Sequence, residues 1–243
     1  MTSLITPEWD LPVGVKSAST TRHGGVSAAP FNTFNLGDHV GDDADAVASN
    51  RHRLVQELGV SGDIIWLEQV HGIDVLTLNS TLPTSQQADA SYTSTPGKVC
   101  AVMTADCLPV LFCSVAGNEV AAAHAGWRGL QAGILEQTVG HFSAEPENIM
   151  AWLGPAIGPE QFEVGSEVRD AFISVDPQAK LAFKARGDKY LADIYLLATQ
   201  RLNALGVQHI YGGDYCTVSQ PELFFSYRRE QQTGRMASLI WLD

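Results

Sequence analysis

The chain has 243 residues, of which 45% are hydrophobic and 17% are charged, as is typical of a soluble globular enzyme with a substantial core. It carries 15 Lys and Arg against 27 Asp and Glu, for a formal net charge of −12. This charge disfavours broad electrostatic binding to DNA, RNA or an anionic lipid surface. An anionic substrate would instead be held by a few local arginines.

The sequence predicts a cytoplasmic protein. No basic residue precedes Lys16 and no sustained apolar stretch follows the start, so a signal peptide is not expected. The longest apolar region, 99–115, is too short to span a membrane. The four cysteines form no CxxC pair and do not suggest a disulfide framework: Cys100, Cys107, Cys113 and Cys216.

The first half of the chain is predicted to hold one helix and several strands. Asp42 and Asp43 can cap a helix that runs through RHRLVQEL and ends at Gly59. Strand-like apolar runs follow at 64–70, 98–105, 108–115 and 118–124. Several are apolar throughout, as in strands covered on both faces. Because these runs succeed one another without helices, a regular βαβ repeat is not expected.

The second half mixes both element types. Residues 126–142 and 193–206 place apolar side chains along one helical face, with strands predicted at 148–154 and 238–242. RGDKYLADI, at 186–194, is interpreted as a charged turn before a helix. No repeat or linker divides the chain, so we expect one domain over 1–243. The fold class is α/β or α+β, with mixed sheets and helices packed outside them.

Several apolar runs end in polar residues that can bind metals or take part in catalysis. At the end of a strand, the rigid fold can hold such side chains in a fixed position. These are Glu68, Gln69 and His71 in WLEQVHG, Asp106 and Cys107 in MTADC, and His124 and Arg128 in AAAHAGWRG. In the last motif, a helix start with two glycines and an arginine also suits an anion.

His71, Cys107 and His124 together offer two imidazoles and a thiolate. Three protein ligands with an open fourth position are the form of a catalytic zinc site, where a bound water has its pKa lowered to ~7. Taken alone, each residue is more often part of a core. A Cys107 nucleophile with a histidine base is an alternative.

Copper is a third interpretation, because two histidines and a cysteine also form blue-copper sites. The chain has seven histidines and no HxH pair, which argues against a full multicopper oxidase.

Two Gly- and Asn-bearing loops, 19–27 and 34–43, supply Arg22, Asn35 and His39 as further polar candidates. Ordinary turn chemistry is the favoured interpretation of His39.

FFSYRRE adds Tyr227, Arg228 and Arg229, interpreted as a strand on which at most one of the arginines faces a site. GPAIGP, at 154–159, is interpreted as a rigid structural loop.

The motifs together resemble the laccase-domain family, also called the polyphenol oxidase or purine nucleoside phosphorylase family, and most of all its enterobacterial peptidoglycan editing factors. The motifs are STTRHGGVS, FNLGDHVGDD, WLEQVHG, ADASYT, MTADCLPV, AAAHAGWRG, WLGPAIGP, DIYLLA and FFSYRRE with TGRMAS. They cover nearly the whole chain, and QVHG, TADC and HAGWRG are specific in combination.

The resemblance implies a sandwich-like α/β fold, similar to a toxin's cysteine-hydrolase domain, with metal ligands at His71, Cys107 and His124. It implies phosphorolysis of purine nucleosides, including methylthioadenosine, with adenosine deamination alongside. It also implies hydrolysis of an amide in serine-bearing muramic precursors. Laccase activity, from which the family takes its older name, is a further implied activity.

These activities assign roles to the candidate residues. Deamination suits zinc with a carboxylate proton shuttle, for which Asp106 or Glu68 would serve. Phosphorolysis needs cations for phosphate, and Arg128 with Arg22 or Arg228 would supply them. The remaining predicted substrate residues are Asn35, Gln69 and Tyr227.

A zinc-dependent phosphorylase and deaminase is thus the leading hypothesis. An amidase, a copper oxidase acting on phenols and a non-enzymatic binding module are the alternatives.

Overall fold

The computed structural model describes residues 3–60, 62, 64–79 and 85–243. The strands are β1 Leu4–Ile5, β2 Val15–Thr20, β3 Ile64–Ile65, β4 Val75–Thr77, β5 Ala90–Thr93, β6 Val99–Thr104, β7 Leu108–Ser114, β8 Val120–Ala125, β9 Ile149–Leu153, β10 Glu163–Val164, β11 Phe183–Arg186, β12 Lys189–Ala192, β13 His209–Gly212 and β14 Met236–Leu242. The helices are α1 Ala44–Leu58, α2 Trp127–Ala132, α3 Ile134–Val139, α4 Ser166–Val175, α5 Ile194–Leu205 and α6 Tyr227–Glu230, with short 3-10 turns at Pro146–Asn148 and Pro177–Ala182.

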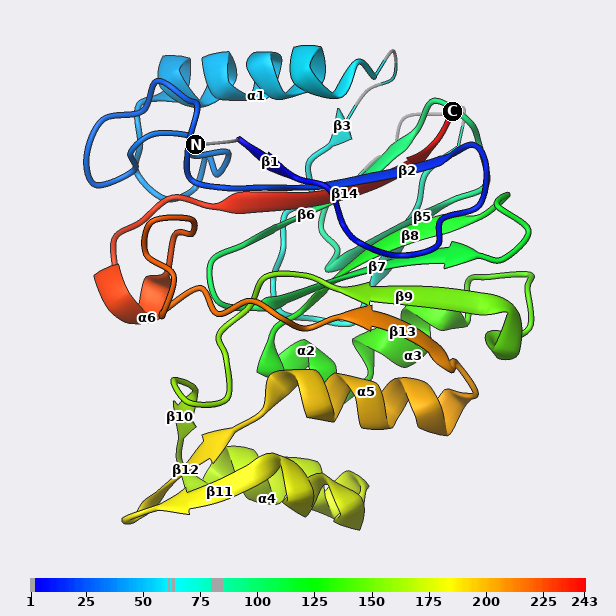
Figure 1. Ribbon diagram of the computed structural model, residues 1–243, viewed down its shortest axis with the longest axis vertical. Coiled ribbons are helices and arrows are strands. Elements are labelled where there is room, and N and C mark those ends of the chain that lie inside the picture. The colour runs from blue at the N-terminus through cyan, green and yellow to red at the C-terminus, as the bar shows by residue number, and fades with distance from the viewer. Residues whose placement is uncertain (1–2, 61, 63, 80–84) are drawn as a thin grey trace.

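Two mixed sheets face one another, and helices cover their outer faces (Figure 1). The first sheet has the order β1-β2-β14-β6-β3, and the second has the order β13-β9-β7-β8-β5-β4. Most neighbours are antiparallel, but β3–β6, β4–β5 and β9–β13 are parallel. The prediction of mixed sheets in a sandwich-like core with flanking helices is confirmed.

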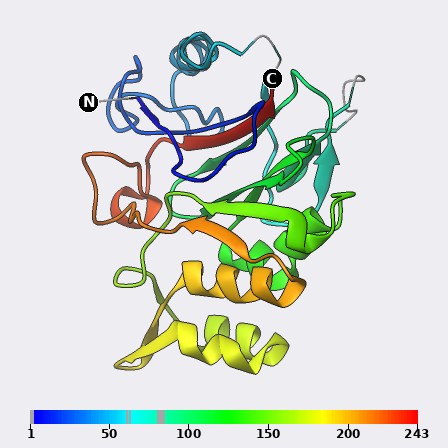
Figure 2. The same cartoon turned by 45° about the vertical axis from the view of Figure 1, so that its right-hand side comes forward.

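The space between the sheets is filled from both sides. Cys100 and Ile240 of the first sheet pack with Leu111, Ala122 and Trp152 of the second. Helices α2, α3 and α5 bury the other face of the second sheet, and α1 covers the first (Figures 1 and 2). The central strands are therefore buried on both faces, which explains their continuous apolar sequences.

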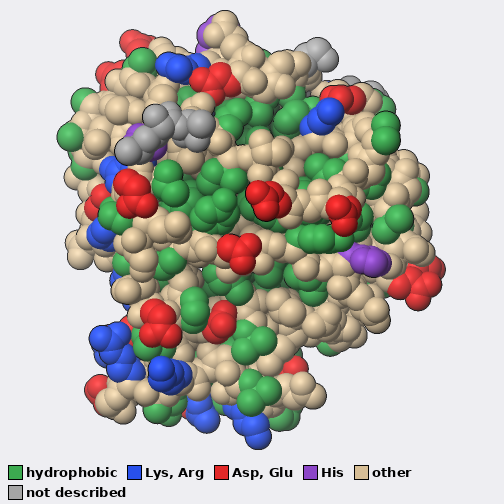
Figure 3. All heavy atoms as spheres, in the orientation of Figure 1, with side chains coloured by type: hydrophobic (Ala, Val, Ile, Leu, Met, Phe, Trp, Pro, Cys, Tyr) green, Lys and Arg blue, Asp and Glu red, His purple; other side chains and the backbone are tan. Residues whose placement is uncertain are grey.

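A smaller sheet, β10-β12-β11, lies beyond this sandwich with α4 packed against it. The charged turn predicted at 186–194 is limited to residues 187 and 188, because β11 and β12 form an antiparallel hairpin there before α5 begins at Ile194. Gly187 adopts φ 62° at its tip, a left-handed conformation that favours glycine. Figure 3 shows Lys and Arg side chains gathered over this end of the molecule, where Lys184, Arg186 and Lys189 are exposed.

The predicted helix boundaries are confirmed for α1 and α5 and corrected for 126–142. The Asp43 side chain accepts from the Ala46 N–H at 2.9 Å, and Gly59 and Gly206 end their helices with φ of 64° and 98°. Residues 126–142 form two short helices rather than one, because Gly133 breaks them with φ 108°.

Two predicted strands are also corrected. The run 64–70 is a strand only at β3, and its far end is held instead by the Gln69 carboxamide, which pairs with the backbone of Met103 at 2.7 and 2.8 Å. FFSYRRE contains helix α6, not a strand, because the Ser226 hydroxyl caps its start by accepting from the Arg229 N–H. In the described part of the chain, no helix is both long and apolar enough to cross a membrane.

Candidate active site

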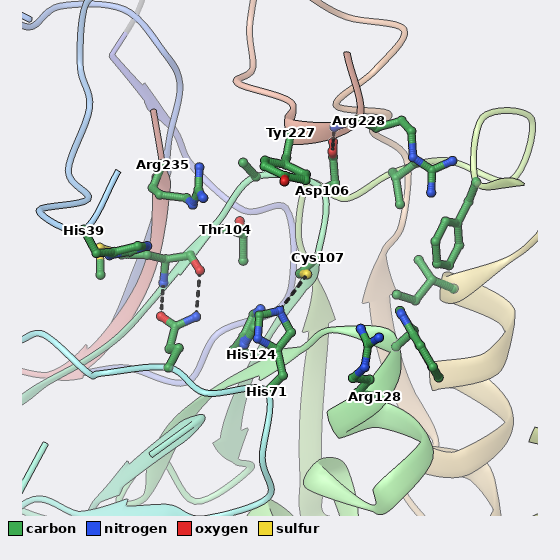
Figure 4. Close-up of a pocket in the computed structure, with 17 residues that line it drawn as sticks. His39, His71, Thr104, Asp106, Cys107, His124, Arg128, Tyr227, Arg228 and Arg235 are labelled. Carbon is green, nitrogen blue, oxygen red and sulfur yellow. Dashed lines mark hydrogen bonds between the residues drawn. The ribbon is translucent and has the colours of Figure 1, made fainter. Parts of the chain in front are cut away.

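Chemistry-bearing side chains from distant segments meet in one pocket of 470 Å³ (Figure 4). The turn between β6 and β7 supplies Asp106 and Cys107, and the end of β8 supplies His124. His71 comes from the segment before β4, and Arg128 from the first turn of α2. Strand ends thus deliver Asp106, Cys107 and His124, as the sequence predicted, whereas His71 lies in a loop and Arg128 in a helix.

His71, Cys107 and His124 are grouped closely enough to share one metal ion, since their ligand atoms all lie within 4.8 Å of one another. The Cys107 Sγ is 3.9 Å from His71 Nε2, and the two imidazole rings have centroids 4.8 Å apart. Within the described ranges, this is the one group of three or more His, Cys, Asp or Glu side chains that lie close enough together to hold a metal ion. Two nitrogens and a sulfur suit zinc in a three-ligand site.

Asp89, which the sequence analysis did not single out, organises two of these ligands. Its buried carboxylate accepts a hydrogen bond from His124 Nδ1 at 2.8 Å, which leaves Nε2 for a metal. The same carboxylate accepts the backbone N–H groups of Val70, His71 and Gly72 at 3.1, 2.9 and 2.6 Å. These bonds hold His71 at φ 61°, a conformation that a residue with a side chain rarely adopts.

Gly126 leaves the space between the three ligands open. A Cβ at this position would lie 3.0 Å from His71 Cδ2, 3.1 Å from Cys107 Sγ and 3.5 Å from His124 Nε2. Every side chain larger than hydrogen would therefore enter the ligand cluster. The donor set and this open space fit a metal ion.

The charges in the cluster are coupled. Burial by itself would raise the pKa of Cys107, but the neighbouring imidazoles outweigh it and lower that pKa to about 6. Burial would likewise lower the pKa of His124, but the Cys107 thiolate and the Asp89 carboxylate raise it to about 9. Without a metal the pair is a thiolate beside an imidazolium, and the thiolate is the form that binds metals or attacks carbonyls.

Asp106 anchors the segment that follows β13. One carboxylate oxygen accepts from the Thr217 hydroxyl and the other from the Arg228 N–H, both at 2.6 Å. Asp106 has φ 88°, so the turn that presents Cys107 is held in a strained conformation. Glu68, the other predicted proton shuttle, is exposed and does not line the pocket.

Aromatic and apolar side chains accompany two of the predicted arginines. The Arg128 guanidinium lies 4.4 Å above the Trp127 ring. Arg228 lies 5.8 Å from the Phe162 ring and donates to the Glu163 carbonyl at 3.1 Å. Tyr227, 57% exposed, lines the same pocket.

Arg22 and Asn35 do not line the pocket. Arg22 lies 4.8 Å from the Phe225 ring and donates to the Pro221 carbonyl at 3.0 Å and to Glu230 at 3.2 Å. The Asn35 carboxamide bonds to Gly37 and to neighbouring polar groups within the protein. Both residues are engaged in holding loops together.

His39, Thr104 and Arg235 line the pocket although none of them was predicted to bind substrate or metal. His39 was interpreted as turn chemistry, and Arg235 lies in TGRMAS, which was quoted only as a motif. Ile157, from the loop interpreted as structural, also lines the pocket. The signal that could have found Arg235 and Thr104 is their position at the ends of two neighbouring strands, β14 and β6.

Known proteins resemble this chain over its whole length. A protein of Escherichia coli (strain K12) named purine nucleoside phosphorylase YfiH is 62% identical over 242 residues, covering 100% of both chains. A purine nucleoside phosphorylase of Haemophilus influenzae is 55% identical over 245 residues, covering 98% of this chain and 99% of the relative. The structure of Neisseria meningitidis protein NMB0706, of the family model DUF152, matches with a TM-score of 0.96 at 48% identity and 100% coverage of both chains.

YlmD from Geobacillus stearothermophilus matches with a TM-score of 0.85 at 35% identity, covering 95% of this chain and 92% of YlmD. The family model described as multi-copper polyphenol oxidoreductase laccase matches residues 16–243. The chain therefore belongs to this laccase-like family, as its motifs predicted.

Proposed function

We propose that the protein is a zinc-dependent purine nucleoside phosphorylase acting on adenosine, inosine and methylthioadenosine. The observation that carries the proposal is one pocket that joins a His-Cys-His cluster to three arginines and to aromatic side chains. Relatives 62% and 55% identical carry the name purine nucleoside phosphorylase, which supports it. We place the reaction in the cytoplasm, where Cys107 stays reduced.

In the proposed reaction, an oxygen of hydrogen phosphate bonds to C1′ of the pentose while the C1′–N9 bond breaks. The proton of the hydrogen phosphate goes to the departing purine, so that adenosine or inosine gives a free base and ribose 1-phosphate. Three arginines line the pocket, Arg128, Arg228 and Arg235, and positive charge from this set would offset the phosphate charge and stabilise charge that develops as the bond breaks. The Trp127 and Phe162 rings offer apolar surfaces to a purine.

His71, Cys107 and His124 would hold the metal, with Asp89 fixing the orientation of His124. A zinc ion in such a site supplies a Lewis acid and lowers the pKa of a bound water to ~7. That chemistry suits adenosine deamination, which we propose as a second activity. Asp106 remains the proton-shuttle candidate, because each of its oxygens keeps a lone pair beyond its bond to Thr217 or Arg228.

A second candidate function is amide hydrolysis on a serine-bearing muramic precursor. The observation that favours it is the thiolate of Cys107 beside the imidazolium of His124, the arrangement of a cysteine nucleophile and its base. Copper oxidation of phenols is the third candidate, supported by the name of the family model and by the donor set.

The deciding experiment measures base release from adenosine and inosine by the purified zinc protein, with and without inorganic phosphate. We expect phosphate-dependent release that is lost together with zinc in His124→Ala. His209→Ala, an exposed histidine on β13 away from the pocket, is the matched control and should keep both.

Each alternative is tested with its own substrate. Serine release from a serine-bearing muramic precursor without phosphate would support the amidase, and a copper absorption band with phenol oxidation by copper-loaded protein would support the oxidase. Zinc-loaded protein that releases no base would overturn the phosphorylase.

A further inference from the structure

Arg235 has a different environment from the other two arginines of the pocket. It directly precedes β14, and its side chain lies across the metal-ligand cluster from Arg128 and Arg228 (Figure 4). Its Nη1 donates to the carbonyls of Thr233 and Gly234 at 3.0 and 3.1 Å. Among residues 3–60, 62, 64–79 and 85–243, no ion pair involves Arg235.

The loop 35–37 sets the position of Arg235. The Asn35 Oδ1 accepts the Arg235 N–H at 2.8 Å, and the Arg235 carbonyl accepts the Leu36 N–H at 3.2 Å. A Cβ on Gly37 would lie 2.8 Å from the Arg235 Cγ, so glycine is needed where the arginine stem passes. Asn35, predicted to bind substrate, acts instead through Arg235.

Arg235 is a half-buried cation that makes no ion pair with a carboxylate of the described residues, so its guanidinium can bind an anion from outside the protein. Burial lowers the pKa of Arg235 from its ordinary value, while the negative charges of Cys107 and Asp106 raise it. The side chain has lost part of its hydration, yet no carboxylate of the described residues compensates its charge directly.

The two sides of the pocket differ in polarity. Arg128 and Arg228 lie beside Trp127 and Phe162, surfaces that suit a purine. Arg235 instead lies with the polar side chains of His39 and Thr104, and the Tyr227 side chain lies between Arg235 and Arg228 (Figure 4). Direct displacement at C1′ needs phosphate and departing base on opposite faces of the pentose, and the pocket has Arg235 on one side and Trp127 and Phe162 on the other.

We propose that Arg235, with His39 and Thr104 beside it, forms the subsite for inorganic phosphate, and that the purine lies on the side of Trp127 and Phe162. This assignment rests on the proposed phosphorylase function. It predicts that phosphate and nucleoside affinities are controlled by different arginines.

The test is steady-state kinetics on zinc-loaded protein with phosphate and inosine varied independently. Arg235→Gln should lower kcat/KM for phosphate on the order of 10- to 100-fold, the effect of losing a hydrogen bond to a charged group. Its KM for inosine should change little. Arg128→Gln is the matched control, and there the larger change should be in the KM for inosine.

A direct binding measurement separates this proposal from the proposed function. Inorganic phosphate is titrated by calorimetry into wild type, Arg235→Gln, Arg235→Lys and Arg128→Gln, each checked for zinc content and unfolding midpoint. We expect binding to be lost in Arg235→Gln, weakened in Arg235→Lys, which keeps the charge but not the planar fork, and kept in Arg128→Gln.

If the wild type releases no base but shows this binding pattern, the phosphorylase function fails and the anion subsite stands. If Arg235→Gln binds phosphate like wild type, or if Arg128→Gln alone loses it, the subsite assignment is overturned. Should Arg235→Gln fail to fold, Arg235→Lys decides, because unchanged phosphate affinity and kcat/KM there would contradict recognition by the planar fork.

Discussion

Two regions of the same pair of strands give their cysteines opposite properties. Cys100, within β6, and Cys113, within β7, are fully buried, and burial raises the pKa of each to about 12. Cys107, in the turn that joins these strands, is partly exposed where it lines the pocket, and although burial by itself would raise its pKa too, that pKa falls to about 6. What differs is the charged neighbourhood, since His71 and His124 face Cys107 alone among the three.

This difference shows where the fold can support chemistry. Inside a strand covered on both faces, no charged side chain acts on the thiols of Cys100 and Cys113, so burial keeps them neutral. At the end of the strand, His124 of β8 meets Asp89, the residue before β5, and Asp89 supports the imidazole that charges the thiol. Four predictions test this contrast, from the largest expected effect to the smallest.

The largest effect is on alkylation of the metal-free protein. At pH 7 the Cys107 thiol is mostly thiolate, whereas a thiol of pKa about 12 is thiolate in only ~10⁻⁵ of molecules. Iodoacetamide should therefore label Cys107 and spare Cys100 and Cys113, as read by peptide mass spectrometry. Because the pKa is lowered, the rate should rise with pH through about 6 and level off above 7.

Adding zinc should protect Cys107 from this labelling. Equal labelling of all three cysteines, or a rate for Cys107 that still rises above pH 8, would contradict the contrast.

Cys107→Ser should abolish zinc binding and base release, because a hydroxyl replaces the thiolate ligand. Cys113→Ser is the matched control. It should retain zinc and activity while losing about 1–3 kcal/mol of stability, the cost of burying an unpaired hydroxyl. Zinc content and urea unfolding of both variants check this, and zinc retained in Cys107→Ser would remove Cys107 from the ligand set.

Asp89→Asn should weaken zinc binding about 10- to 100-fold, as is typical when the partner of a metal-binding histidine is changed. The amide keeps the size of the side chain but replaces one acceptor oxygen by a donor, so it cannot serve all four N–H groups. Competition with a chelator measures the affinity. Unchanged affinity would show that His71 and His124 are oriented without Asp89.

Gly126→Ala should have the smallest effect, because neighbouring atoms can shift by tenths of an ångström. The new methyl group would lie about 3 Å from His71 and Cys107. Overpacking of this kind costs about 1 kcal/mol when the neighbouring atoms can move, which corresponds to a roughly fivefold loss of zinc affinity. Gly140→Ala, at φ −63° and away from the cluster, is the control and should leave affinity unchanged. Equal affinities in both variants would show that the ligand cluster tolerates the methyl group.

Some residues of the site could be predicted from the local sequence, and others could not. His71, Cys107, His124 and Arg128 could be selected from the sequence because each is a polar residue at an end of an apolar run, and such ends are visible locally. Asp89 could not be selected by that reasoning, because its role depends on β5 lying beside β8 and on a carboxylate reaching the backbone of 70–72.

Arg22, Asn35 and Arg235 show the limit most clearly. All three lie in polar loops of similar composition, and sequence alone favoured the first two as substrate residues. Loop 35–37 packs against residues 233–235. In this arrangement Asn35 holds the backbone of Arg235 by a hydrogen bond, and Arg235 lines the pocket.

The sequence by itself determined the class of fold, the helix ends at Gly59 and Gly206, the family and the three candidate metal ligands. Each of these depends on residue types within a few positions of one another, such as glycines that adopt a left-handed conformation and apolar runs that end in polar residues. Only the tertiary structure decided which carboxylate supports the ligands and which arginines line the pocket. Those choices depend on contacts between residues up to 200 positions apart, and the local pattern does not encode them.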